Sequence, residues 1–236
     1  MKRQISIILA AIMLFGTMIT FAQKPFKGTI SYSFSAKGNN DPDVAAQLAS
    51  QKADITIMGN CTKTVVNATG LSVISISNGD TKTAVTIIDI PGMGKYYAEQ
   101  DAKTIQSNFD KVKLDFNYTD ETKTIAGYNC KKCNITLTDL ETDEENIIVT
   151  WTTTELLAGE NINFATYPGL KGFPMETEIT QELETGGKLT IVQSATAVTA
   201  NKKLKSADFT APKDAKSLSE APAEIRTALQ QMLGIE

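Results

Sequence analysis

Histidine is absent from the chain, and Arg3 and Arg226 are the only arginines among its 236 residues. The first absence removes the side chain that most often acts as a general base or zinc ligand near neutral pH. The scarcity of arginine removes the planar groups that bind phosphate and guanine through two parallel hydrogen bonds. A formal net charge of −4 would also repel a phosphate backbone. We therefore expect no nucleic-acid partner.

Motifs that hold cofactors or metals are also missing, since the sequence contains no phosphate-cradling loop and no nucleophile motif. The acidic cluster between Asp139 and Glu145 lacks the spacing and central glycine of a calcium-binding loop, and such a run is typical of a solvated turn. We expect no cofactor, no metal and no catalytic residue. A hydrolase with paired carboxylates stays open as an alternative, because such a pair is defined by separation in space.

Cysteine is represented by Cys61, Cys130 and Cys133, one short of the usual four zinc ligands. The Cys130–Cys133 spacing lies in a strand pattern, where residues three apart are about 10 Å from each other and a disulfide needs roughly 6 Å between Cα atoms. Three alternatives remain: buried thiols, a disulfide from Cys61 to Cys130 or Cys133, and a redox or metal pair. Strand parity predicts that Cys133 lies on the apolar face and Cys130 on the other.

The first 22 residues have the features of a secretory signal peptide. Lys2 and Arg3 precede an apolar run from Ile5 to Phe21, and the small residue Ala22 follows it. We expect cleavage before Gln23 and a soluble, exported protein in the periplasm or outer envelope.

A two-residue alternation of apolar and polar side chains predicts strands, most clearly in Lys27–Ala36 and Val112–Tyr118. The other predicted strands are Ala53–Met58, Thr62–Asn67, Leu71–Ser77, Lys82–Asp89, Lys95–Glu99, Tyr128–Thr138, Asn146–Thr153, Phe173–Leu183 and Lys188–Thr199. Gly59-Asn60, Asn78-Gly79 and Gly186-Gly187 are hairpin signals between them. Strands joined by short turns indicate antiparallel neighbours.

Two amphipathic helices are predicted, one capped by Asp41 with Pro42 in its first turn, and one opened by Pro222 and ended by Gly234. A weaker third lies within Glu99–Asn108. Strands that are apolar on both faces need covers, which the helices would supply. We predict a mainly β (α+β) fold, a curved antiparallel sheet or unclosed β-barrel of about eleven strands with two or three covering helices, forming a single domain over residues 23–236.

A barrel of this strand number has an interior that side chains must fill or a ligand must occupy. The candidate cavity-lining residues are Tyr32, Phe34, Phe116, Tyr118, Trp151 and, on the C-terminal helix, Leu229. The alternative is that these residues pack a solid core.

Three segments resemble a family of exported envelope proteins of unknown function related to the GLPGLI group. They are residues 26–32 (FKGTISY), 124–132 (TIAGYNCKK) and 167–176 (YPGLKGFPME), and the ending ADFTAP at 207–212 is also similar. The resemblance implies a fold similar to that of the periplasmic lipoprotein carrier and its outer-membrane receptor, an unclosed barrel with helices over a hydrophobic cavity. It implies no site residue.

These observations favour a non-enzymatic protein that binds an apolar ligand, such as a lipid, acyl chain or lipoprotein, in a half-barrel cavity. The partners expected are an apolar small molecule or lipid, and a peripheral contact with the cell envelope. Two alternatives stay open: a structural or interaction protein of the envelope with a filled core, and the hydrolase with paired carboxylates.

Overall fold

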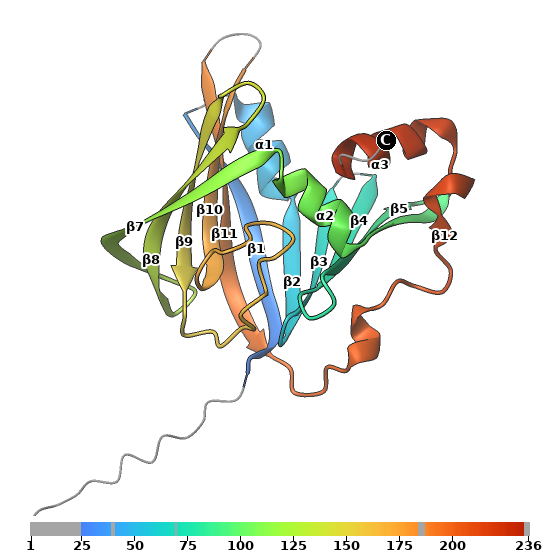
Figure 1. The fold of residues 1–236 in the computed structure, drawn as a ribbon, viewed down its shortest axis with the longest axis horizontal. Helices are drawn as coiled ribbons and strands as arrows, with labels where there is room; N and C mark the ends of the chain where they lie inside the picture. The colour runs from blue at the N-terminus through green and yellow to red at the C-terminus, as the bar shows by residue number, and fades with distance from the viewer. Residues whose placement is uncertain (1–24, 39–40, 69, 184–186, 234–236) are drawn as a thin grey trace, which may run out of the picture.

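The computed structural model describes residues 25–38, 41–68, 70–183 and 187–233, and their strands form one sheet (Figure 1). The twelve strands lie in the order β12-β6-β5-β4-β3-β2-β1-β11-β10-β9-β8-β7. Their bounds are β1 Lys27–Lys37, β2 Lys52–Met58, β3 Cys61–Ala68, β4 Leu71–Asn78, β5 Thr83–Ile90, β6 Gly94–Gln100, β7 Val112–Ile125, β8 Tyr128–Asp139, β9 Glu145–Thr153, β10 Phe173–Glu182, β11 Lys188–Ala200 and β12 Lys216–Ser217. The predicted signal peptide and Gly186 lie outside the described residues, and so does Gly234.

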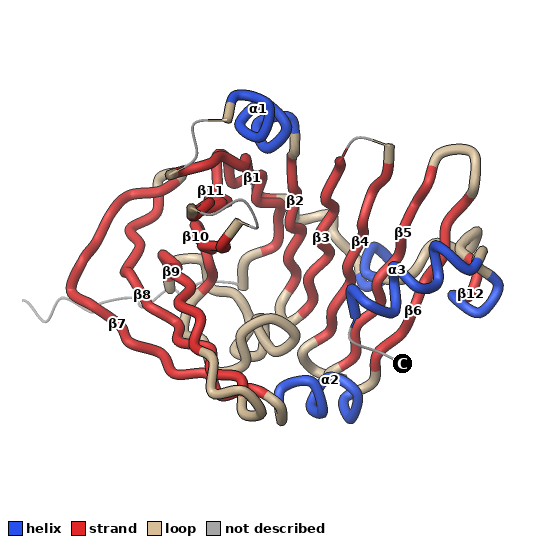
Figure 2. The backbone as a smooth tube through the Cα atoms, turned by 90° about the horizontal axis from the view of Figure 1, so that it is seen from above, coloured by secondary structure: helices blue, strands red, loops and turns tan. Residues whose placement is uncertain are grey.

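The sheet curves strongly along one half and stays open, as Figure 2 shows. Strands β7 to β11 and β1 curl into a half-barrel, and β2 to β6 continue from β1 as a flatter wing. Strand β1 joins the two parts, because it pairs antiparallel with β11 on one side and with β2 on the other. The predicted fold class, a curved unclosed sheet with a few helices, is confirmed.

The structure extends the predicted strands in two places. Strand β7 continues past Tyr118 to Ile125 after a bulge between Tyr118 and Thr122, and then turns into β8 through Ala126 and Gly127, both with positive φ. The exposed polar residues at the bulge hide this continuation from a hydropathy pattern. Strand β12 is two residues long and parallel to β6, too short to leave a periodic signal.

The three α-helices are α1 (Pro42–Ser50), α2 (Ala102–Phe109) and α3 (Ala223–Leu233). The side chain of Asp41 caps α1 as predicted, and Asp101 caps α2 by accepting a hydrogen bond from the Thr104 backbone N–H at 2.8 Å. Both amphipathic helices were predicted to cover the strands that are apolar on both faces. Helix α1 packs against β1 instead, and only α3 lies over those strands. None of the described helices has the length and hydropathy needed to cross a membrane.

Helix α3 covers one end of the wing. Its residue Ile225, with Ala221, packs against Ile88 of β5 and Tyr96 of β6. Helix α2 carries the chain from the β6 edge to the β7 edge, and Ile105 is its buried residue. The loop between β9 and β10, residues 154–172, lies inside the curve of the half-barrel in Figure 2.

All three cysteines are free thiols, so the predicted disulfide from Cys61 to Cys130 or Cys133 is not formed. Five strands separate β3, which carries Cys61, from β8, which carries the other two. Cys130 and Cys133 are both fully buried, in different clusters of the core. Strand parity predicted Cys130 on the face opposite the apolar one, but that face is buried here too, because Cys130 packs in the core cluster of Tyr32 and Leu156.

These environments predict an order of thiol reactivity. Burial raises the pKa of all three thiols, that of Cys130 to about 11, and the Asp80 charge adds to the rise at Cys61. Cys61 is only half-buried, however, whereas Cys130 and Cys133 are fully buried and out of reach of the reagent. Only the thiolate reacts with iodoacetamide. We expect native protein to take up one alkyl group, on Cys61, and urea-unfolded protein to take up three.

Intact mass followed by peptide mapping measures this order, and Cys61→Ser supplies the control that should take up none. Alkylation of Cys130 in the native protein at the rate of Cys61 would contradict its placement in the core.

Candidate functional site

Hydroxyl side chains form two adjacent rows across the concave face of the wing. In the first row Ile55 of β2 is followed by Thr64, Ser75 and Thr86 on successive strands, each paired with the next in the antiparallel register. In the second row Ile57 is followed by Thr62, Ser77 and Ala84, and then by Gln100. We call Thr62, Thr64, Ser75, Ser77 and Thr86 the hydroxyl rows.

The half-barrel wall of the same concave face carries an apolar row instead. Ile191, Ile179, Ile148 and Ile135 are paired residues on β11, β10, β9 and β8, and Phe116 of β7 ends the series. We call these four isoleucines the isoleucine row. Ile135 is fully buried, whereas Ile179 is 38% exposed. The row therefore begins inside the core and ends as an open apolar surface.

Two adjoining cavities lie between these walls. The one we call the tyrosine cavity, of about 230 Å³, is lined by Tyr32, Ile55, Ile162, Phe173, Ile179 and Gln193, among others. The one we call the hydroxyl cavity, of about 340 Å³, is lined by the hydroxyl rows and roofed by Ile105 and Phe109 of α2. Thr62, Thr64 and Thr166 line both, so the cavities meet there and form one groove.

The loop over the groove is fixed by its own polar contacts. The side-chain amide of Asn163 donates to the carbonyl oxygens of Leu170 at 3.1 Å and of Gly172 at 2.8 Å. The hydroxyl of Tyr32 donates to the Pro174 carbonyl at 2.7 Å. Burial raises the pKa of Tyr32 far above its ordinary value. This tyrosine is thus a neutral hydrogen-bond donor at every physiological pH, and it ties β1 to the start of β10.

The described lining of the two cavities contains no aspartate, glutamate, lysine or arginine. Charged residues make up 21% of the chain, so their absence from the whole groove distinguishes it from the outer surface. The lining offers no carboxylate pair for acid–base chemistry. Within the described part of the chain, no group of histidine, cysteine, aspartate or glutamate side chains is arranged to hold a metal ion.

Of the sequence-predicted cavity residues whose side chains are described, Tyr32 alone lines the groove. Tyr32 lines the tyrosine cavity, and Phe34 packs against the core beside it. Phe116 packs with Leu170 and Ile135, at the buried end of the isoleucine row. Tyr118 is at the sheet edge, where its oxygen accepts a hydrogen bond from the Lys171 backbone N–H at 2.7 Å. Tyr118 therefore anchors the loop at the rim and does not line either cavity.

Trp151 and Leu229 are not shown to line the groove. Trp151 packs against the core cluster that contains Tyr32 and Phe173, but it is absent from the described lining of both cavities. Leu229 lies on α3, and its side chain falls outside the described part of the structure. The hydroxyl rows were missed, although Thr62 and Thr64 in β3 and Ser75 and Ser77 in β4 show the same two-residue period as the apolar residues.

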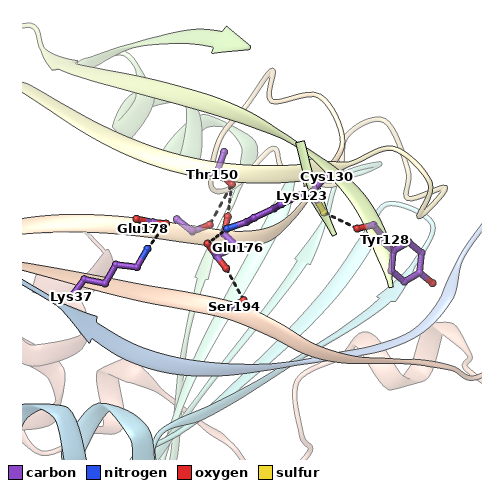
Figure 3. Close-up of polar contacts among 9 residues, drawn as sticks. Lys37, Lys123, Tyr128, Cys130, Thr150, Glu176, Glu178 and Ser194 are labelled. Atoms are coloured by element: carbon purple, nitrogen blue, oxygen red, sulfur yellow. Dashed lines mark hydrogen bonds and ion pairs between the residues drawn. The ribbon is translucent and has the colours of Figure 1, made fainter. Parts of the chain in front are cut away.

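A network of polar and charged contacts centres on Glu176, next to Trp151, and Figure 3 shows the contacts of this carboxylate. Lys123 lies over the Trp151 ring, 4.2 Å from its centroid, and forms an ion pair with Glu176. The Ser194 hydroxyl donates to the same carboxylate at 2.8 Å, and Thr150 donates to the Glu176 backbone carbonyl at 3.0 Å. Burial alone would raise the pKa of Glu176, but the hydrogen bonds from Lys123 and Ser194 and the lysine charge outweigh it and lower that pKa.

The lowered pKa of Glu176 predicts a pH-dependent contribution to stability. A group whose pKa is lower in the folded state stabilises the fold above its unfolded pKa of about 4.3, and this stabilisation is lost as the pH falls through the folded value. Glu176→Gln should lower the free energy of unfolding at pH 7 by about 1–3 kcal/mol. It should also reduce the loss of stability between neutral and acidic pH.

Urea unfolding followed by circular dichroism at several pH values measures both effects. Glu182→Gln is the matched control, because the Glu182–Lys188 pair is exposed and should contribute little. An acid profile of Glu176→Gln that parallels the unaltered protein would refute the assignment.

Solved structures of PNGF-II resemble the fold of this chain. The structure in space group C2 has 14% sequence identity and a TM-score of 0.50, and the one in space group P21 has 16% identity and a TM-score of 0.48. The matches cover 87% and 88% of this chain but 33% of each PNGF-II chain, so this chain spans about a third of their length. At this identity the likeness concerns the fold alone.

No protein-family model and no curated protein matches the chain. The resemblance to the envelope family related to the GLPGLI group stays a prediction.

Proposed function

We propose that this protein is an exported, non-enzymatic binding protein that takes the apolar part of a ligand, such as an acyl chain, into the tyrosine cavity. The observation that carries the proposal is the isoleucine row, which leaves the core and continues into this cavity. Ile179 belongs to both, and it is 38% exposed. Contact with an apolar ligand would remove this surface from water, which stabilises a complex by about 25 cal/mol per Å².

The rest of the cavity lining supports the same proposal. Ile55 and Ile162 line the tyrosine cavity together with Ile179, and Phe173 adds an aromatic side chain. Such a lining, apolar with a few placed polar groups, is typical of small-molecule sites. The hydroxyl of Tyr32 and the amide of Asn163 are already used within the protein, so the apolar side chains supply most of the free contact surface.

The alternative of an interaction protein with a filled core is favoured less by this geometry. A filled core would have no reason to leave an isoleucine of the concave face exposed beside a cavity. The alternative of a hydrolase with paired carboxylates has no support in the described lining of the groove, which holds none.

Charged substitution of Ile179 provides the test. Ile179→Asp places a carboxylate at the mouth of the tyrosine cavity, where it opposes entry of an alkyl chain. We expect the protein to bind a fluorescent fatty-acid analogue and Ile179→Asp to weaken that binding about tenfold or more, measured by fluorescence titration.

Ile147→Asp is the matched control. Ile147 is 59% exposed and precedes Ile148 on β9, so it points to the opposite face of the sheet. The Ile147→Asp variant should bind the analogue as tightly as the unaltered protein does. Absence of binding to the unaltered protein, or an equal loss in both variants, would overturn the proposal.

A further inference from the structure

The hydroxyl cavity has a chemistry that an acyl chain does not need. Its strand-borne lining consists of the hydroxyl rows with Ile76, Ala84 and Gln100, and it adjoins the apolar tyrosine cavity through Thr62 and Thr64. A ligand that extends from one cavity to the other would thus pass from isoleucines to hydroxyl groups.

Several of these hydroxyls have no hydrogen-bond partner in the part of the chain that the structure describes. Thr62 and Ser77 hydrogen-bond to each other at 2.6 Å. The side chains of Thr64, Ser75 and Thr86, in contrast, make no hydrogen bond within the described residues. Thr86 is only 7% exposed and lines the cavity. A hydroxyl that lines a cavity without a protein partner is free to bond to water or to a ligand.

The spacing of the three hydroxyls suits a ligand with several hydroxyl groups of its own. Thr64, Ser75 and Thr86 are direct cross-strand neighbours, and such neighbours lie about 5 Å apart. Each hydroxyl can both donate and accept, which matches a polyhydroxylated group in any orientation of its protons. Neighbouring Thr62 and Ser77 can exchange their mutual bond for bonds to the same group.

The absence of charge excludes the common ionic head groups. A phosphate, sulfate or carboxylate brought into this lining would lose its hydration without gaining a lysine or arginine, since none lines either cavity. A quaternary ammonium would likewise find no carboxylate. A neutral head group loses far less hydration free energy when it enters the cavity.

From these observations we infer that the ligand is a neutral amphiphile, with an alkyl chain in the tyrosine cavity and an uncharged polyhydroxylated head, of the sugar or glycerol kind, on the hydroxyl rows. This inference rests on the proposed function, because it assigns the alkyl chain to the same tyrosine cavity. It adds the chemical class of the remainder of the ligand.

Probes with one alkyl chain and different heads test the inference. Octyl β-D-glucoside, monooctanoylglycerol, octanoate and octylphosphocholine are titrated as monomers into the protein by isothermal calorimetry. We expect the glucoside or the glycerol ester, or both, to bind at least tenfold more tightly than the two charged probes. The preferred one of the pair identifies the head as a sugar or a glycerol.

Removal of the hydroxyls supplies the second arm. Thr64→Val with Thr86→Val keeps side-chain shape and removes two unpaired hydroxyls, so it should weaken the neutral probe about tenfold or more and leave octanoate unchanged. Thr56→Val is the control, since Thr56 bonds to Thr29 on the opposite face of β2. Thermal unfolding of each variant verifies that it is folded.

The outcomes separate the two proposals. If no octyl probe binds, the proposed function fails, and the inference fails with it. If all four probes bind equally, or if the double variant retains full affinity for the neutral probe, the tyrosine cavity binds chains but the head-group inference is wrong. If glucose alone bound as tightly as the glucoside, the inference that the ligand is an amphiphile would be contradicted.

Discussion

The antiparallel register between neighbouring strands is the constraint on which the groove depends. Side chains alternate between the two faces, so a slip of one residue between two strands would move a whole set of groups to the other face. Thr64, Ser75 and Thr86 come from three strands. They lie side by side only because the register of β3 with β4 pairs Thr64 with Ser75, and the register of β4 with β5 pairs Ser75 with Thr86. The isoleucine row is assembled in the same way, over four strands.

The local period made most strands predictable from the sequence, and the capping residue Asp41 did the same for the start of α1. It gave the starts of β1 and β7, and Asp41 and Pro42 correctly marked the beginning of α1. The second half of β7 could not be predicted, because its bulge interrupts the period. Strand β12 depends on a parallel contact with distant β6, and nothing in Lys216 and Ser217 themselves indicates it.

The candidate site was harder to predict than the fold, and the reason is again the choice of face. Tyr32 was predicted to line a cavity, and the structure places it there. Trp151 has the same aromatic character and packs against the same core cluster, yet it lines neither cavity. A single sequence gives the parity within a strand, not which face the sheet will turn inward. For Thr62 and Thr64 the uncertainty was greater still, since hydroxyls are as common on solvated faces as in a polar groove.

Strand β1 has a consequence for how the protein reaches its working form. Strands β2 to β6 and β7 to β11 each pair with neighbours in the sequence, and both groups can form from short-range contacts. Only β1 connects them, and its pairing with β11 brings Gly28 next to Ala200. Closing so long a loop is entropically costly, which makes it a late step in folding. The hydroxyl rows can therefore form well before the groove does, because the groove acquires its second wall only when β11 pairs with β1.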